Sequence, residues 1–180
     1  MSGGPDARRW GWNRLEREWA QRVVDAARIT PGELVVDLGA GTGALTDPLV
    51  RAGARVLAVE LHPGRAAVLR RRFEGCAVTV VRADVLEIRL PSGPFRVVAN
   101  PAYAISTPLL RRLLSRGSSS MRGADLVLQR AVVNRYVGGR SPGGERWRRT
   151  FDAQLGLRLP RRAFTPVPVV DSAVLRLRRR

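Results

Sequence analysis

The chain has 180 residues, enough for one domain with a buried core, and 44% of them are hydrophobic. It contains no apolar run of about 18 residues, which argues against a membrane span, and its polar start resembles no secretion signal. The single cysteine, Cys76, excludes an intramolecular disulfide framework and a cysteine-based metal site. We therefore expect a cytoplasmic protein, most simply a monomer, without a metal ion or a membrane partner.

Charge is the most informative bulk property of this chain. The formal net charge is +17, and all 32 basic residues are arginine. A GC-rich genome would explain the absence of lysine, because arginine codons are GC-rich, but it would not explain the size of the excess. Such an excess suits a polyanion, and nucleic acid is the first candidate. Guanidinium groups also fork onto phosphates and stack on bases.

Hydrophobic periodicity predicts strands that alternate with helices. Apolar residues recur at helical spacing from Leu15 to Ala27, and Pro31-Gly32 ends that helix. The alternation that follows predicts a parallel sheet with helices on both faces. The expected elements, in chain order, are helix 14–27, strand 34–36, helix 44–51, strand 55–59, helix 63–73, strand 78–81, strand 95–99, helix 108–114, strand 126–128 and strand 172–177.

Three segments fall outside this pattern. Residues 1–9 are interpreted as a flexible basic arm that precedes a single domain, residues 10–180. Residues 115–123 are rich in serine and glycine, and residues 138–149 combine glycines with arginines. We interpret the segment 138–149 as a mobile loop on a binding face, with an ordinary solvated connector as the alternative.

Polar residues follow the first three strands of the predicted sheet, where ligands of parallel sheets bind. From Asp37 to Gly43 the sequence is Asp-Leu-Gly-Ala-Gly-Thr-Gly, whose glycines let a turn pass close to a ligand with backbone N–H groups facing it. Glu60 is placed to hold two ribose hydroxyls, and Asp84 is placed to accept from an adenine amino group. The loop and Glu60 fit a nicotinamide dinucleotide as well.

The turn after the fourth strand, Asn100-Pro101-Ala102-Tyr103, favours methylation of an amino group. The N6 lone pair of adenine is delocalised into the ring, which makes this nitrogen a poor nucleophile. The Asn100 side-chain oxygen and the Pro101 carbonyl can accept from the N6 hydrogens and hold the nitrogen in line with a methyl group. Tyr103 can stack on a base that has left its helix or loop. A turn without chemistry is the simpler alternative.

With these residues in place, the chain resembles the ribosomal RNA adenine N6-methyltransferases, which comprise the Erm macrolide-resistance enzymes and the small-subunit dimethyladenosine transferases. The resemblance implies an α/β fold, that of Rossmann-like class I S-adenosylmethionine-dependent methyltransferases. Its sheet would be mostly parallel and seven-stranded, with helices on both faces and a C-terminal antiparallel hairpin. The resemblance covers nearly the whole chain and rests on residues 35–46, 58–60, 83–85, 97–108, 126–130, 162–166 and 171–174.

The resemblance also assigns roles to individual residues, with S-adenosylmethionine as the cofactor. Asn100, Pro101, Tyr103 and Phe164 would form the catalytic site, with Tyr103 stacked on the target adenine and Phe164 near it. The cofactor contacts would be Asn13, Leu15, Gly39, Ala40, Gly41, Glu60, Leu61, Asp84, Val85 and Asn100. The residues expected to contact RNA are Arg111, Arg112, Arg146, Trp147, Arg148 and Arg149.

Three departures from the family pattern bear on these expectations. Trp12 and Arg14 stand where glutamine and phenylalanine are typical. The proline of the catalytic turn comes one place earlier than in Asn-Ile/Leu-Pro-Tyr, which should keep the main-chain acceptor. The chain ends at Arg180, so we expect the family's C-terminal helical domain to be absent, as in the short actinobacterial Erm form. The arginine excess would then help to hold RNA.

The leading expectation is N6-methylation of an adenine in 23S rRNA at the peptide exit tunnel, before the subunit is fully assembled. Methylation there would confer resistance to macrolides, lincosamides and streptogramin B. The alternatives are dimethylation of 16S rRNA in small-subunit biogenesis, a noncatalytic RNA-binding assembly factor and, less well supported, a DNA adenine methyltransferase.

Overall fold

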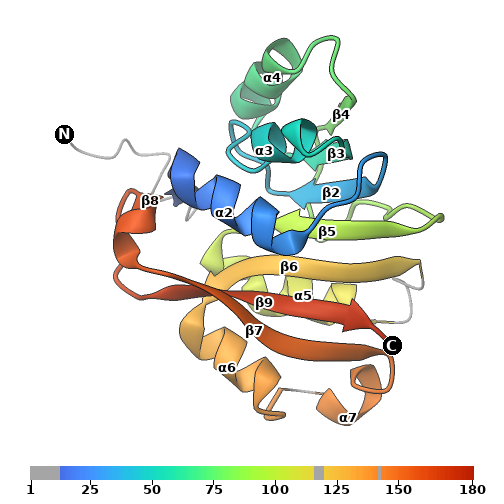
Figure 1. Cartoon of the computed structure of the whole chain (residues 1–180), viewed down its shortest axis with the longest axis vertical. Helices are drawn as coiled ribbons and strands as arrows, with labels where there is room; N and C mark the ends of the chain where they lie inside the picture. Colours follow the sequence, from blue (N-terminus) through green and yellow to red (C-terminus); the bar gives the residue numbers. More distant parts are fainter. Residues whose placement is uncertain (1–12, 116–119, 142) are drawn as a thin grey trace.

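The structure is a computed structural model that describes residues 13–115, 120–141 and 143–180 (Figure 1). Its main sheet has seven strands in the order β4-β3-β2-β5-β6-β9-β7. These are β2 (Leu34–Leu38), β3 (Arg55–Val59), β4 (Val78–Val81), β5 (Phe95–Ala99), β6 (Met121–Gln129), β7 (Phe151–Leu159) and β9 (Ser172–Arg179). The helices are α2 (Arg17–Ala27), α3 (Thr46–Arg51), α4 (Pro63–Arg72), α5 (Ser106–Leu113), α6 (Arg130–Val137) and α7 (Gly144–Trp147). Short 3-10 turns span Tyr103–Ile105 and Arg161–Ala163.

The sheet is parallel from β4 to β6 and ends in an antiparallel pair. β2 pairs in parallel with β3 and β5, β3 with β4, and β5 with β6. β9 runs antiparallel to both β6 and β7. The expected fold class, a mostly parallel seven-stranded sheet with a C-terminal antiparallel hairpin, is therefore confirmed.

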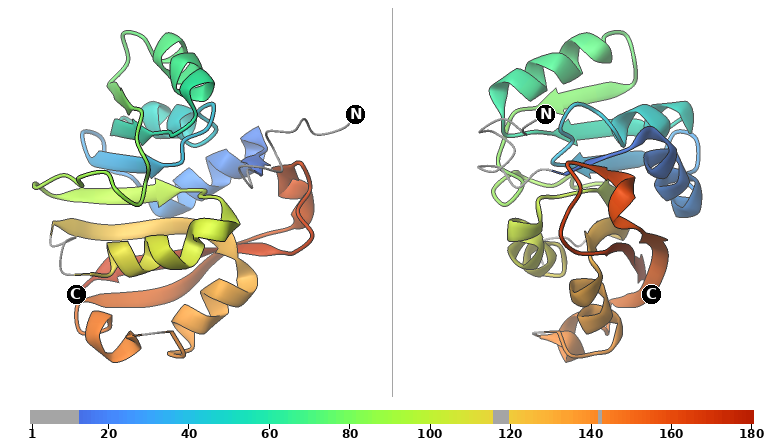
Figure 2. Two further views of the ribbon diagram at one scale, coloured as in Figure 1. Left: turned by 180° about the vertical axis from the view of Figure 1, so that it is seen from behind. Right: turned by 90° about the vertical axis from the view of Figure 1, so that its left-hand side faces the viewer.

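Helices lie on both faces of this sheet (Figures 1 and 2), and an apolar cluster packs against each face. Successive side chains of a strand point to opposite faces, so Val97 joins the cluster with α5 and α6, whereas Val98 joins the cluster with α2, α3 and α4. Every residue of β5 is buried. Burial on both faces explains why the central strands β2 and β5 are mostly apolar in the sequence, with Asp37 and Arg96 as the exceptions.

The structure differs from the sequence-based expectation at the two ends of the chain. Helix α2 begins at Arg17 because the two residues of β1 (Arg14–Leu15) pair with β8 (Phe164–Thr165). Strand β6 begins at Met121, and strand β7 was not expected. The expected loop 138–149 contains the short helix α7. The predicted arm, residues 1–9, lies outside the described residues, and within the described part no helix is long and apolar enough to cross a membrane.

Candidate active site

The main-chain N–H groups at the start of the glycine-rich turn after β2 are hydrogen-bonded to β3. Gly39 and Gly43 have φ angles of 80° and 95°, which favour glycine, and a Cβ at Gly43 would lie 2.6 Å from the ring of Phe73. The N–H groups of Gly39 and Ala40 both donate to the Val59 carbonyl, at 2.9 and 3.0 Å. These N–H groups therefore do not face a ligand, contrary to the sequence-based expectation.

Glu60, at the end of β3, forms a further hydrogen bond with the glycine turn. Its carboxylate, 5% exposed, accepts from the N–H of Gly41 at 2.8 Å and from the N–H of His62 at 2.8 Å. A dinucleotide needs free N–H groups in this loop for its pyrophosphate. Because Gly39, Ala40 and Gly41 all donate within the protein, the geometry favours a nucleoside ligand without phosphates over a nicotinamide dinucleotide.

The neighbouring strand supplies the next polar group. Asp84 is half-buried just beyond β4, and its Oδ1 accepts from the N–H of Leu86 at 2.8 Å. Val85 is buried, whereas Leu61 is exposed beside Glu60. Because β4, β3 and β2 are adjacent, Asp84, Glu60 and the glycine turn lie next to one another at the carboxyl ends of these strands, as the sequence predicts.

Asp37, at the end of β2, is a buried carboxyl that the sequence-based site did not include. It accepts a hydrogen bond from the Thr46 hydroxyl at 2.7 Å. Burial, together with the nearby charge of Glu60, raises the pKa of Asp37 from 3.8 to about 7, although the Thr46 hydrogen bond opposes this rise. Thr46 lies nine residues further on, at the start of α3, which is why the pattern of the loop alone did not indicate this pair.

The raised pKa predicts a pH-dependent stability. Between pH 3.8 and about 7 the folded chain holds the Asp37 proton that the unfolded chain has released, so this group lowers stability as pH rises through that window. Asp37→Asn removes the titration, and we expect its urea midpoint to rise relative to the native chain from pH 5 to pH 8. An unchanged difference between the two proteins at both pH values would contradict the assignment.

Asn100 lies at the end of β5, and its amide is oriented by the N-terminal segment. Its Nδ2 donates to the main-chain carbonyl of Asn13 at 2.7 Å. A carbonyl can only accept, so the NH₂ group must face Asn13, and Oδ1 is left to accept from another group. A Cβ on Gly39 would lie 3.8 Å from the Cα of Pro101, so the Asn100-Pro101 turn packs directly against the glycine turn.

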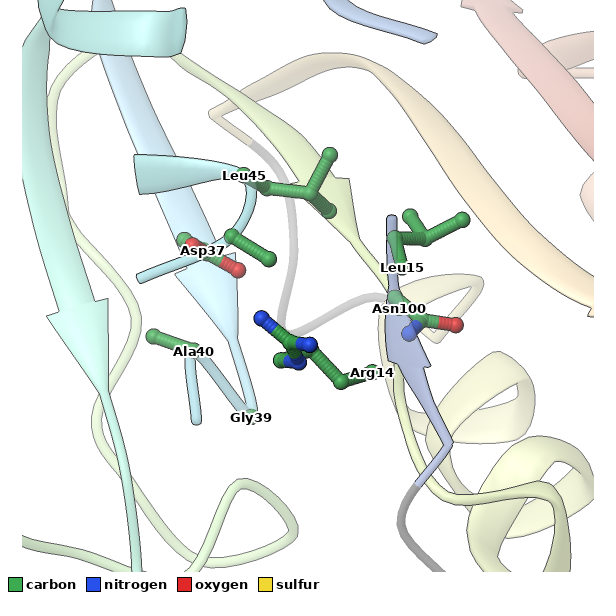
Figure 3. A pocket seen from close by; sticks show the side chains of 8 residues that line it. Arg14, Leu15, Asp37, Gly39, Ala40, Leu45 and Asn100 are labelled. Carbon is green, nitrogen blue, oxygen red and sulfur yellow. The ribbon is translucent and has the colours of Figure 1, made fainter. Parts of the chain in front are cut away.

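Figure 3 shows the pocket between these two turns. One wall comes from β2 and the glycine turn, and the opposite wall comes from β1 and the end of β5. The guanidinium group of Arg14 points into the space between the walls, a position that the sequence analysis did not predict. The pocket is lined by Arg14, Leu15, Asp37, Gly39, Ala40, Ala44, Leu45 and Asn100.

The two aromatic residues of the predicted catalytic site have different environments. Tyr103 is half-buried, and its hydroxyl lies 2.5 Å from the Ser172 hydroxyl at the start of β9. Burial raises the pKa of Tyr103, so the phenol stays neutral. Phe164 is only 1% exposed and packs in the core beneath α2, with its backbone paired to Leu15. The placement of Phe164 near the target adenine stays a prediction.

The six residues expected to contact RNA divide into two groups. Arg112 donates to the Leu86 carbonyl at 2.5 Å and also to the Ile88 carbonyl, and Arg148 donates to the carbonyls of Tyr136 and Val137, both at 2.9 Å. The Trp147 ring is 5% exposed and packs 5.9 Å from the Tyr136 ring. These three residues contribute to the stability of the fold, and their predicted RNA contacts stay predictions. The remaining three residues, Arg111, Arg146 and Arg149, are exposed.

The fold and the strand-end features together are those of the Rossmann-like class I methyltransferases. Residues 12–180 match the family model described as "Ribosomal RNA adenine dimethylase". This chain belongs to that family.

Relatives from both branches of the family are similar to the chain. The rRNA adenine N-6-methyltransferase of Corynebacterium diphtheriae is 35% identical over 87% of this chain and 62% of its own length. Ribosomal RNA small subunit methyltransferase A of Thermosynechococcus vestitus is 38% identical over 93% of this chain and 66% of its own length. The crystal structure of the 23S rRNA methyltransferase ErmE has a TM-score of 0.85 and 32% identity, and the match covers 93% of this chain and 70% of that one. The chain spans only 57 to 62% of the length of several curated relatives.

Proposed function

We propose that this chain transfers a methyl group from S-adenosylmethionine to the N6 nitrogen of an adenine in ribosomal RNA. The observation that carries the proposal is the packing of the Asn100-Pro101 turn against the glycine turn, with 3.8 Å between the Cα of Pro101 and a Cβ placed on Gly39. This packing brings an amino-group acceptor to the edge of a nucleoside site. When bound, the cofactor would supply a methyl group on a positively charged sulfur.

The residues that would hold the cofactor fit a nucleoside with an amino-acid tail. Asp84 would accept from the adenine amino group, and the remaining lone pairs of Glu60 would accept from the ribose hydroxyls. The tail would then lie between β2 and β5, beside Gly39 and Asn100. No phosphate-binding N–H group is required of the glycine turn, which agrees with the hydrogen bonds that it makes within the protein.

Asn100 and Pro101 would position the substrate nitrogen. The free Oδ1 of Asn100 and the Pro101 carbonyl would accept from the two N6 hydrogens of adenine, which favours a more tetrahedral nitrogen as the new bond forms. Tyr103, fixed through its hydroxyl to Ser172, would stack on the flipped base. The protein would contribute positioning and hydrogen bonding rather than a covalent nucleophile.

We place the target in 23S rRNA, in the resistance branch of the family. The similarity to ErmE, whose title names a 23S rRNA methyltransferase, supports this placement. The 38% identity to a small-subunit methyltransferase favours 16S rRNA as the second candidate. Either substrate implies action in the cytoplasm, where ribosomal subunits are assembled.

The experiment that tests the function is methyl transfer from labelled S-adenosylmethionine to protein-free large- and small-subunit rRNA, with primer extension to map the product. We expect one dominant adenine at the drug-binding loop of the large subunit. Label confined to small-subunit RNA would move the protein to the second candidate. A chain that binds the cofactor but labels neither RNA would contradict the proposal.

An arginine-lined groove is our proposed surface for the RNA backbone. It consists of two adjoining pockets, one bordered by α5, α6 and α7 and the other by α7, β7 and β9, which share the lining residues Leu114, Ser115, Arg146 and Trp147. Exposed Arg146 and its neighbours can neutralise phosphates, whereas the buried Trp147 forms part of the floor. The charged residues that line the groove are Arg111, Arg146, Arg149 and Arg179.

The double variant Arg146→Ser with Arg149→Ser tests this surface. We expect weaker RNA binding on every sequence, and a slope of log affinity against log salt that is shallower by about 1 to 2. The matched control is Arg70→Ser with Arg71→Ser, which removes two exposed arginines of α4 outside the groove. Equal effects of both double variants would indicate general charge attraction rather than a groove.

A further inference from the structure

Arg14 places a guanidinium group inside the pocket that lies between the glycine turn and Asn100 (Figure 3). The residue belongs to β1, and its backbone is fixed opposite Thr165 of β8 in a two-stranded sheet. Its side chain stands where the resemblance places a phenylalanine. At this position the chain therefore has a cationic side chain where the family typically has an apolar one. We ask which anion could bind it.

The order of the strands identifies which part of the cofactor faces Arg14. Asp84, Glu60 and Gly39 follow β4, β3 and β2, which are adjacent in that order, and Asn100 follows β5. A nucleoside whose base lies at Asp84 and whose ribose lies at Glu60 extends its tail toward the gap between β2 and β5. That gap is the pocket that Arg14 enters. The tail of S-adenosylmethionine ends in an amino acid, which carries an α-carboxylate.

The surroundings of the Arg14 side chain leave it available for such an anion. Its nearest charge partner among the described residues is Glu16, whose Oε1 lies 3.7 Å from Nη2, and both side chains are close to half exposed. A pair of this length and exposure is weak. Glu16 also accepts from the Thr165 hydroxyl at 2.5 Å, so it keeps a partner if Arg14 turns away. The flat fork of a guanidinium group matches a carboxylate with two parallel hydrogen bonds.

We propose that Arg14 binds the α-carboxylate of the methionine moiety and thereby selects cofactors that carry the complete amino-acid tail. The inference rests on the proposed use of S-adenosylmethionine, but it concerns the cofactor alone and does not depend on which RNA is methylated.

The test compares two ligands that differ in their tails. S-adenosylhomocysteine carries the carboxylate, whereas 5′-methylthioadenosine keeps the nucleoside and sulfur but lacks the amino acid. We expect Arg14→Met to weaken S-adenosylhomocysteine binding by about 10- to 100-fold in calorimetric titrations, as loss of a hydrogen-bonded charge pair predicts. Binding of 5′-methylthioadenosine should change by less than about twofold, since the lost interaction involves only the tail.

Two further variants make the result specific. Arg14→Lys keeps the charge without the fork and should recover part of the loss. Arg17→Met removes an exposed arginine of α2 that does not line the pocket, and it should bind both ligands as the native chain does.

The outcomes separate this inference from the proposed function. Equal losses for both ligands in Arg14→Met would show a structural role, and no loss would show that Arg14 does not touch the tail; either result overturns the inference and leaves the function standing. A native chain that binds neither ligand would overturn both.

Discussion

Asn100→Ala is expected to lower the rate of methyl transfer by about 100- to 1,000-fold, the usual cost of removing one preorganised hydrogen-bonding group from a reacting centre. The Oδ1 of Asn100 is the acceptor that would hold one N6 hydrogen of adenine, and its orientation is set by the 2.7 Å hydrogen bond from Nδ2 to Asn13. Alanine removes both the acceptor and this tie. The rate should be measured in single turnovers with saturating RNA and cofactor, so that chemistry rather than binding is observed.

Binding measurements distinguish loss of the N6 acceptor from loss of the hydrogen bond to Asn13. S-adenosylhomocysteine affinity reports whether the N-terminal segment still closes the pocket, and we expect it to stay within about tenfold of the native value, because one neutral hydrogen bond is lost. Asn134→Ala is the matched control, since Asn134 is an exposed asparagine on α6 far along the chain from the site. If Asn100→Ala turned over at the native rate, the acceptor role would have to be abandoned.

The parallel half of the sheet could be predicted from the sequence because its strands are buried on both faces. Residues 34–36 are a continuous apolar run and residues 95–99 are apolar except for Arg96, and such runs are typical of central parallel strands. The start of β6 was missed because Gly123 and Asp125 interrupt its apolar pattern. Strand β7 was missed because its outer side chains include Asp152 and Gln154, which are exposed at the edge of the sheet.

The candidate site, like the sheet, could be predicted only in part from the sequence. Glu60, Asp84 and Asn100 could be placed because the carboxyl ends of adjacent parallel strands lie at the same end of the sheet. This rule requires only that the strands are predicted correctly. Contacts between distant segments could not be derived in this way. Trp147 lies among arginines in the sequence, yet its indole N–H donates to the Ser141 hydroxyl at 3.2 Å in a buried position.

The sequence also does not show which arginine side chains form contacts within the protein. The net charge of +17 suggests that all arginines are available to bind RNA, but several of them instead stabilise the fold. Arg96 and Arg176 donate to main-chain carbonyls at the end of α2, Ala27 at 2.8 Å and Ala26 at 2.6 Å. Cations at a helix C-terminus satisfy carbonyls that lack an intrahelical partner. Only the remaining, exposed arginines are available to a polyanion.

Asp125→Ala is expected to destabilise the protein by about 3 to 5 kcal/mol, the usual cost of breaking a buried ion pair by removing one partner. Asp125 is fully buried in β6, where it contacts Arg96 at 2.8 Å, Arg176 at 3.1 Å and Arg178 at 2.8 Å. Burial lowers the pKa of Arg178, and the charge of Asp125 opposes this effect. Without the carboxylate, three guanidinium groups would face one another in a partly dry environment, and two of them also hold the end of α2.

Urea unfolding measures this cost, and a lower midpoint at an unchanged slope identifies a loss of stability rather than a change of compactness. Asp152→Ala is the control, because Asp152 forms an exposed pair with Arg180 at 2.6 Å and should contribute less than about 1 kcal/mol. Asp125→Asn, which keeps the volume, should still lose much of the stability if charge is the cause. If Asp125→Asn unfolded at the native midpoint while Asp125→Ala did not, packing rather than charge would explain the burial of this residue.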